Sequence, residues 1–187
     1  MNERFSRQIF CPSDFSPTEK RRAMTPTTVK RWLELGCTVQ IPMDYGTQIG
    51  FDDNDYAAAG AVLAADPGLA MAQADILLRV KTTAAQLAET KLGAWHLSFL
   101  DPVNEQNMLQ QLNQRALSVF SLEMMPRTTL AQSMDALSSQ ANLAGYAAVL
   151  AAAERSSKVL PMMTTPAGSI SPARVLVLGA GVAGLQA

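Results

Sequence analysis

Residues 126–154 read PRTTLAQSMDALSSQANLAGYAAVLAAAE, and the rest of the chain is organised around this stretch. Apolar residues recur in it at steps of three and four, which is the period of an amphipathic helix. They are Leu130, Met134, Leu137, Ala141, Ala144 and Ala148. Polar residues follow the same rhythm on the opposite side, namely Gln132, Asp135, Ser139, Asn142 and Tyr146, with Ser138 nearby. The pattern predicts one long helix that links two domains and carries amide, carboxyl and hydroxyl groups along one side.

The start of this helix is marked by Pro126, because proline cannot continue a preceding helix or strand ladder. Thr129, followed three residues later by Gln132, fits a capping box. Gln132 therefore has two interpretations: it closes this box, or it forms a polar site with Arg127, Asp135 and Ser138. Asp135 is likewise either a site residue or a solvated helix residue, and the spacing agrees with both.

Composition limits the classes of protein to consider. The chain has 187 residues, 48% of them hydrophobic and 17% charged, which suits one full domain and part of another. Its net charge of -1 does not indicate the excess positive charge that binding to nucleic acid or an anionic membrane needs. The longest uncharged apolar run, residues 141–153, is shorter than the roughly 20 residues that span a bilayer. Cys11 and Cys37 lie far apart and form no metal or redox pair by spacing, so we expect a soluble, reduced, cytoplasmic chain without a metal.

The residues before the long helix alternate between strand and helix patterns. We expect strands at residues 7–12, 38–41, 75–81, 94–100 and 117–122, and helices at 26–35, 55–64, 83–91 and 103–114. Strands separated by helices of about ten residues indicate βαβ units and a parallel sheet. The expected organisation is an N-terminal α/β domain over residues 1–126, a linking helix over 127–155, and a linker with the start of a Rossmann domain over 156–187.

The last segment carries a glycine motif after an apolar strand, Val175 to Leu178. Gly179, Gly181 and Gly184 form a G-x-G-x-x-G turn, in which the first glycine allows a tight turn and the second lets the backbone approach a pyrophosphate. The third lets helix and strand pack closely. The alternative is a tight βα turn with no ligand. An acidic residue for the ribose, expected about 20 positions further on, would distinguish nucleotide binding from this alternative. Because the sequence stops at Ala187, we expect the first βα turn of a truncated Rossmann domain.

Two further sets of charged or titratable residues have competing interpretations. Arg79 and Lys81 end an expected strand at the carboxyl edge of the sheet, where open α/β folds bind ligands, but solvated strand-end charges would look the same. His96 alternates with Ala94 and Ser98 on one strand face, which favours a hydrogen-bonded structural histidine over a site residue.

Four segments resemble a known family: RRAMTP, ADILLRVK, the PRTTLAQSMDALSSQANLAGY block and PARVLVLGAGVAGLQA. Together they are similar to the alpha subunit of proton-translocating NAD(P) transhydrogenase, whose soluble relative is alanine dehydrogenase. The resemblance implies the NAD(H)-binding component of an enzyme that passes hydride from NADH to NADP+. It also implies a homodimer, cytoplasmic and peripheral to the inner membrane, with an NADP-binding subunit or domain and a proton-translocating membrane subunit as partners.

The resemblance also implies roles for particular residues, with NAD as the cofactor. Arg127, Gln132, Asp135 and Ser138 would hold the dihydronicotinamide ring and its carboxamide. The pyrophosphate turn would consist of Gly179, Ala180, Gly181, Val182 and Gly184.

Alanine dehydrogenases add a substrate site, and one of its residues is missing here. Arg21 and Lys81 match the arginine and lysine that those enzymes use on pyruvate, whereas Asp101 stands where their catalytic histidine would align. That difference argues for transhydrogenation and against amino-acid oxidation. Two alternatives stay open: an alanine dehydrogenase-like oxidoreductase, and a non-catalytic fragment for dimerisation or docking.

Overall fold

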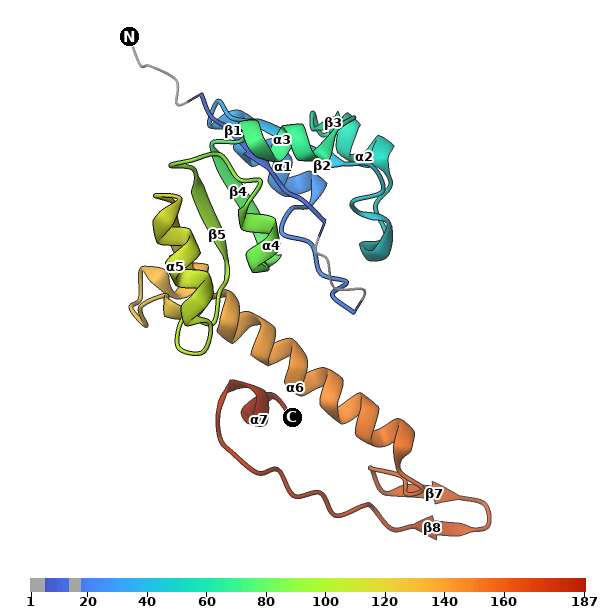
Figure 1. Ribbon diagram of the computed structural model, residues 1–187. Coiled ribbons are helices and arrows are strands. Elements are labelled where there is room, and N and C mark those ends of the chain that lie inside the picture. Colours follow the sequence, from blue (N-terminus) through green and yellow to red (C-terminus); the bar gives the residue numbers. More distant parts are fainter. Residues whose placement is uncertain (1–5, 14–17) are drawn as a thin grey trace. The chain divides into compact units, whose positions relative to one another are not determined.

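The computed structural model describes residues 6–13 and 18–187 (Figure 1). The chain divides into two compact units, Met1–Met124 and Met125–Ala187. Of the helices in the described residues, none combines the length and apolar character needed to cross a membrane.

The first unit is built on a six-stranded sheet in which every neighbouring pair of strands is parallel. The strands are β1 (Gln8–Phe10), β2 (Thr38–Pro42), β3 (Val62–Ala64), β4 (Ile76–Lys81), β5 (Trp95–Phe99) and β6 (Ser118–Ser121). Their order in the sheet is β3-β2-β1-β4-β5-β6, so the direction of winding reverses between β1 and β4. The parallel α/β fold expected from the sequence is confirmed, and all carboxyl ends of its strands meet at one edge.

The local signals of the first helix act as the sequence predicts. Helix α1 (Pro26–Glu34) starts after Thr25, whose side chain accepts a hydrogen bond from the backbone N–H of Thr28. Proline at the first helical position suits its fixed φ. The helix is followed by Gly36 at φ 88°, a left-handed conformation that only glycine adopts without strain.

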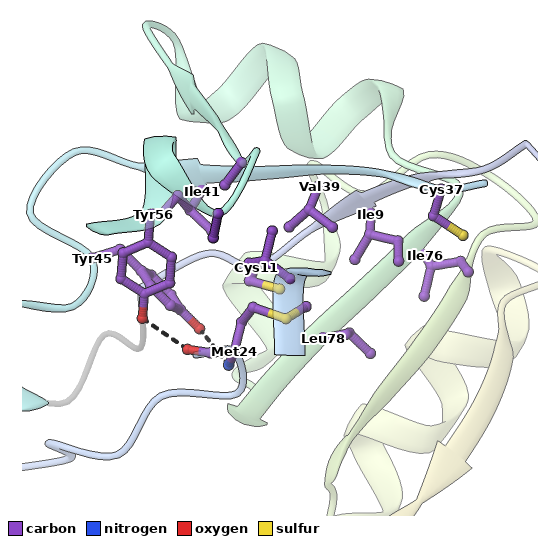
Figure 2. Packing of buried hydrophobic residues seen from close by; sticks show 13 residues of the cluster. Ile9, Cys11, Met24, Cys37, Val39, Ile41, Tyr45, Tyr56, Ile76 and Leu78 are labelled. Carbon is purple, nitrogen blue, oxygen red and sulfur yellow. Dashed lines mark hydrogen bonds between the residues drawn. The ribbon is translucent and has the colours of Figure 1, made fainter. Parts of the chain in front are cut away.

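Helices α1 and α2 (Asp53–Ala58) cover one face of the sheet, and the core of the unit lies beneath them. Figure 2 shows this core, with the hydroxyls of Tyr45 and Tyr56 directed at Met24. Tyr56 donates to the carbonyl of Met24 at 2.9 Å, and the N–H of Met24 donates to Tyr45 at 3.2 Å. Both hydroxyls are therefore satisfied although the side chains are buried, which burial requires.

The opposite face of the sheet carries the other helices of the unit. Phe10 and Leu77 pack there with Met71 of α3 (Pro67–Gln73). Helices α4 (Ala84–Leu87) and α5 (Gln106–Gln114) enclose a separate cluster that includes Leu87, Leu100, Met108 and Leu112.

One expected element of this unit is wrong. The helix predicted over residues 55–64 ends at Ala58, and strand β3 follows it. Gly60 at φ 95° breaks the helix, and Asp66 then caps α3, whose first residue is Pro67. The alanine-rich sequence hid this strand, because alanine fits helix interiors and does not favour a strand.

The second unit contains the long helix, α6 (Ala136–Arg155), preceded by a 3-10 turn, η3 (Ala131–Met134). The helix begins later than expected, because η3 and its flanking residues occupy the stretch that follows Pro126. A hairpin of β7 (Met163–Thr165) and β8 (Gly168–Ile170) lies in the expected linker, and a short helix, α7 (Val182–Gln186), follows the glycine motif.

The strand expected at Val175 to Leu178 does not form. These four side chains are between 45% and 87% exposed, and no strand pairs with them among the described residues. A β-strand needs a hydrogen-bonded neighbour, so the apolar pattern alone does not produce one.

Candidate functional site

The N-terminus of α6 brings together two of the four residues expected at the nicotinamide, Asp135 and Ser138. Asp135 is the N-cap, and one carboxylate oxygen accepts from the backbone N–H of Ser138 at 2.9 Å. The other carboxylate oxygen accepts from the Ser138 hydroxyl at 2.6 Å. These two hydrogen bonds, and more weakly the charge of Arg127, hold the pKa of Asp135 below its ordinary value. Asp135 is therefore a carboxylate fixed by the backbone and the hydroxyl of Ser138.

Gln132 lies in η3, exposed, and does not close a capping box. The cap of α6 is made by Asp135 with Ser138, and the side chain that serves the 3-10 turn is that of Thr128, not Thr129. Thr128 accepts there from the N–H of Ala131 at 3.3 Å. The capping interpretation of Gln132 and Thr129 is therefore wrong. What links Gln132 to the cap is its carbonyl, which accepts from the N–H of Asp135 at 3.3 Å.

The glycine turn has the geometry that the motif needs at two of its three glycines. Gly179 has φ 109°, which a side chain would strain. A Cβ on Gly184 would overlap the carbonyl oxygen of Gly179, so only glycine permits this close approach. A Cβ on Gly181 would meet nothing within 4 Å, so the backbone there faces open space that a ligand can enter. Ala180 and Val182 complete the exposed turn. The turn therefore combines a tight bend at Gly179, close packing at Gly184 and an open face at Gly181.

Helix α7, which follows the turn, packs against the middle of α6. Asn142 donates from Nδ2 to Oε1 of Gln186 at 3.1 Å. A Cβ on Gly145 would overlap the carbonyl oxygen of Ala183, so the two helices touch backbone to backbone. The sequence placed Asn142 on the polar side of the helix but assigned no role to it or to Gly145. A glycine inside a helix that otherwise favours alanine was the available signal.

A second group of polar residues lies at the carboxyl edge of the first unit. Lys81, Asp101 and Glu123 line a cavity of about 410 Å³. Asp101 has φ 48°, and its carboxylate accepts from Nδ2 of Asn104 at 2.9 Å. Asp101 thus has a left-handed backbone conformation that is uncommon for residues other than glycine.

Glu123, which the sequence did not single out, holds this edge together. Its carboxylate accepts from the N–H groups of Leu100 and Asp101 and, at 2.7 Å, from the hydroxyl of Ser121. Burial acts to raise the pKa of Glu123, but these hydrogen bonds outweigh it and lower the pKa below its ordinary value.

Three other residues considered in the sequence analysis, Arg21, Arg79 and His96, each have contacts of their own. Arg21 forms an ion pair with Glu19, with N and O at 2.6 Å. Arg79 is buried and donates to the sulfur of Met71, so its interpretation as a solvated strand-end charge is wrong. His96 is fully buried with Nε2 3.0 Å from the hydroxyl of Ser98, which confirms a structural histidine. Burial, with a smaller effect of Arg79, lowers the pKa of His96 to about 4.

Comparison with known proteins assigns the chain to a family. The family model described as "Alanine dehydrogenase/PNT, N-terminal domain" matches residues 10–144, and the C-terminal domain of the same family matches residues 148–187. The chain belongs to the alanine dehydrogenase/PNT family. The resemblance stated from the sequence is therefore confirmed.

Individual relatives separate the two branches of the alanine dehydrogenase/PNT family. An NAD(P) transhydrogenase subunit alpha polypeptide of Rhodospirillum rubrum is 39% identical over 96% of this chain and 48% of its own length. The crystal structure of transhydrogenase from Sinorhizobium meliloti superposes with a TM-score of 0.90 at 38% identity, over 96% of this chain and 51% of that one. Alanine dehydrogenase of Halomonas elongata is 28% identical over 96% of this chain and 49% of its own length. The chain thus spans about half the length of these relatives and is more similar to the transhydrogenases.

Proposed function

We propose that this chain forms the N-terminal part of the NAD(H)-binding subunit of an NAD(P) transhydrogenase, which passes hydride from NADH to NADP+ coupled to proton translocation. The observation that carries the proposal is the polar cluster at the start of α6. Asp135, fixed by two hydrogen bonds from Ser138, caps the helix against which the glycine turn and α7 pack, and the charge of Arg127 helps to lower its pKa. A dinucleotide has a ring end and a pyrophosphate, and this helix carries groups suited to both.

The chemistry of the reaction suits these residues. The cofactor supplies the hydride, so the protein needs no acid or base of its own and must only orient two rings. Arg127, Gln132, Asp135 and Ser138 have that task in the proposal, with donors and acceptors for a carboxamide. Gly179, Ala180, Gly181, Val182 and Gly184 would take the pyrophosphate, with Gly181 giving the backbone its open face.

The partners and the place of the reaction belong to the same proposal. The chain would work as a homodimer, cytoplasmic and peripheral to the inner membrane, with an NADP-binding subunit or domain and a membrane subunit. Support comes from the identity to NAD(P) transhydrogenase subunits alpha, which exceeds that to alanine dehydrogenase at 39% against 28%.

The test uses what we call the extended subunit, a polypeptide that contains this chain and has the full length of the Rhodospirillum rubrum relative, of which this chain spans 48%. Mixed with a transhydrogenase NADP-binding domain, NADH and NADP+, it should form NADPH in a single turnover, measured by rapid quenching and chromatographic separation of NADPH from NADH. Binding of NADH without any transfer to NADP+ would contradict the proposal.

A further inference from the structure

Helix α6 carries two sets of groups at a fixed spacing, and the inference drawn from this rests on the proposed function. Asp135 and Ser138 stand at its first turn, while Asn142 and Gly145 contact α7 further along. From Ser138 to Gly145 the helix advances about 10 Å, at 1.5 Å per residue. A straight helix keeps such a distance constant, because its backbone hydrogen bonds leave little freedom along the axis.

The contact at Gly145 is a backbone contact with no room for adjustment by side chains. A Cβ there would overlap the carbonyl oxygen of Ala183 and would lie 3.0 Å and 3.1 Å from its carbonyl carbon and Cα. Gly145 is also the one buried residue of α6, among neighbours that are exposed or half-buried. Glycine inside a helix is unfavourable compared with alanine, so the close approach is the physical reason for a glycine here.

The contact continues from α7 into the glycine turn. Ala183 lies on α7 next to Gly184, and Gly184 in turn packs against the carbonyl oxygen of Gly179. The N–H of Leu185 donates to the carbonyl of Gly181 at 2.9 Å, which closes the same segment on itself. Turn and α7 therefore form one small body that rests on α6 through Ala183 and Gln186.

We propose that Gly145 and Asn142 are positioning residues that set the distance between the pyrophosphate turn and the residues that hold the nicotinamide ring. In this proposal neither residue contacts the cofactor, because Asn142 bonds Gln186 and Gly145 packs against Ala183. They act through Ala183 and Gln186, so that a ligand reaching both ends at once finds them at the right separation. The affinity of a ligand that binds only at the turn does not depend on this distance.

The experiment follows from that difference between ligands. Affinities for NADH and for ADP, which carries the pyrophosphate without the ring, are measured by calorimetry on the extended subunit. Gly145→Ala should weaken NADH about tenfold, as expected for a displacement of a fraction of an ångström to 1 Å, and leave the affinity for ADP nearly unchanged. Asn142→Ala removes one hydrogen bond and creates no steric overlap. It should weaken NADH binding by a smaller factor and also leave ADP binding nearly unchanged. Because it introduces no overlap, it tests the inference even if Gly145→Ala fails to fold.

Ala144→Gly is the matched control, because this exposed neighbour loses a methyl group and helix propensity without touching α7. It should leave both affinities unchanged. Equal losses of NADH and ADP affinity in Gly145→Ala would show a merely structural residue and overturn the inference, as would an unchanged NADH affinity. If the wild-type extended subunit binds NADH but transfers no hydride, only the proposed function is contradicted. The comparison of NADH and ADP affinities still tests the positioning role.

Discussion

Asp135 accepts two hydrogen bonds from Ser138, one from its backbone N–H at 2.9 Å and one from its hydroxyl at 2.6 Å. The first bond caps the helix and fixes the carboxylate relative to the backbone, while the second orients the hydroxyl. A polar group that must hold a ring in place is best fixed before the ring arrives. The helix cap and the candidate nicotinamide site are thus one structure.

The first prediction concerns the pKa of Asp135. Ser138→Ala removes the hydroxyl bond and keeps the backbone bond, so the pKa of Asp135 should rise towards its ordinary value without loss of the helix. A carboxyl with a lowered pKa stabilises the fold above its unfolded pKa and loses that contribution as pH falls through the folded value. The variant should therefore lose this pH-dependent stability at a higher pH than the wild type.

Titration by NMR checks this pKa, with Ser139→Ala as the control. The hydroxyl of Ser139 donates to the carbonyl of Asp135 and not to its carboxylate, so this variant should leave the pKa in place. An Asp135 pKa that is the same in Ser138→Ala and in the wild type would contradict the prediction.

The second prediction concerns the buried His96, whose pKa is lowered to about 4 by burial and, less, by Arg79. The unfolded histidine takes up a proton near its ordinary pKa of 6.5, whereas the folded one stays neutral down to about pH 4. The fold is therefore destabilised as pH falls from 6.5 to 4, by up to roughly 3 kcal/mol. In His96→Gln, which does not titrate, the free energy of unfolding measured in urea should fall less over this range. An identical pH dependence in both proteins would show that His96 is not the group involved.

The third prediction separates the glycines of the turn. Gly184→Ala should displace Gly179 and lower both the melting temperature and NADH affinity of the extended subunit, because its Cβ overlaps a backbone oxygen. Gly181→Ala should keep the melting temperature, since its Cβ meets nothing within 4 Å, but weaken NADH binding about tenfold or more by filling the open face. Calorimetry and thermal unfolding of the two variants give the comparison. Full NADH affinity in Gly181→Ala would mean that no pyrophosphate approaches this backbone.

The fourth prediction concerns the carboxyl edge of the first unit. By the family resemblance, Asp101 would occupy the position of the catalytic histidine of alanine dehydrogenases. Its carboxylate accepts from Asn104, and its backbone N–H donates to Glu123. A carboxylate held in this way is a poor replacement for an imidazole near neutral pH. The extended subunit should therefore show no NAD-dependent oxidation of L-alanine above background. Pyruvate formation that disappears in Lys81→Ala would reverse this conclusion.

The sequence predicted those regions of the fold whose signals are local. The helix expected at residues 26–35 is α1, delimited by Thr25, Pro26 and Gly36, and the strand expected at residues 75–81 is β4. The prediction was wrong where two signals competed or where a distant partner was needed. Alanine-rich residues hid β3 and α3, and Val175 to Leu178 form no strand because a strand depends on its neighbour.

The candidate site shows the same division. Helical spacing marked Asp135 and Ser138 as polar neighbours three residues apart, and the family resemblance implied their role at the nicotinamide. The start of α6 was misplaced, because both Thr129 with Gln132 and Asp135 with Ser138 suit the start of a helix by spacing. Glu123 and Gly145 went unnoticed, since their contacts, with Leu100 and Asp101 and with Ala183, join residues more than 20 positions apart in the sequence.

Gln132 offers the most direct test of the proposed site. Its side chain is exposed and caps no helix, so Gln132→Ala should change the free energy of unfolding by no more than about 0.5 kcal/mol. The loss of ring orientation alone should slow hydride transfer far more than it weakens NADH binding. Ser133→Ala, an exposed neighbour in the same turn, is the control.

The decisive measurement is the single-turnover rate of hydride transfer from NADH to NADP+ in the extended subunit with its NADP-binding partner, beside the NADH dissociation constant. We predict a rate about 100-fold lower in Gln132→Ala, with a dissociation constant within about threefold of the wild type. Transfer at the wild-type rate would contradict the assignment of this helix start to the nicotinamide ring.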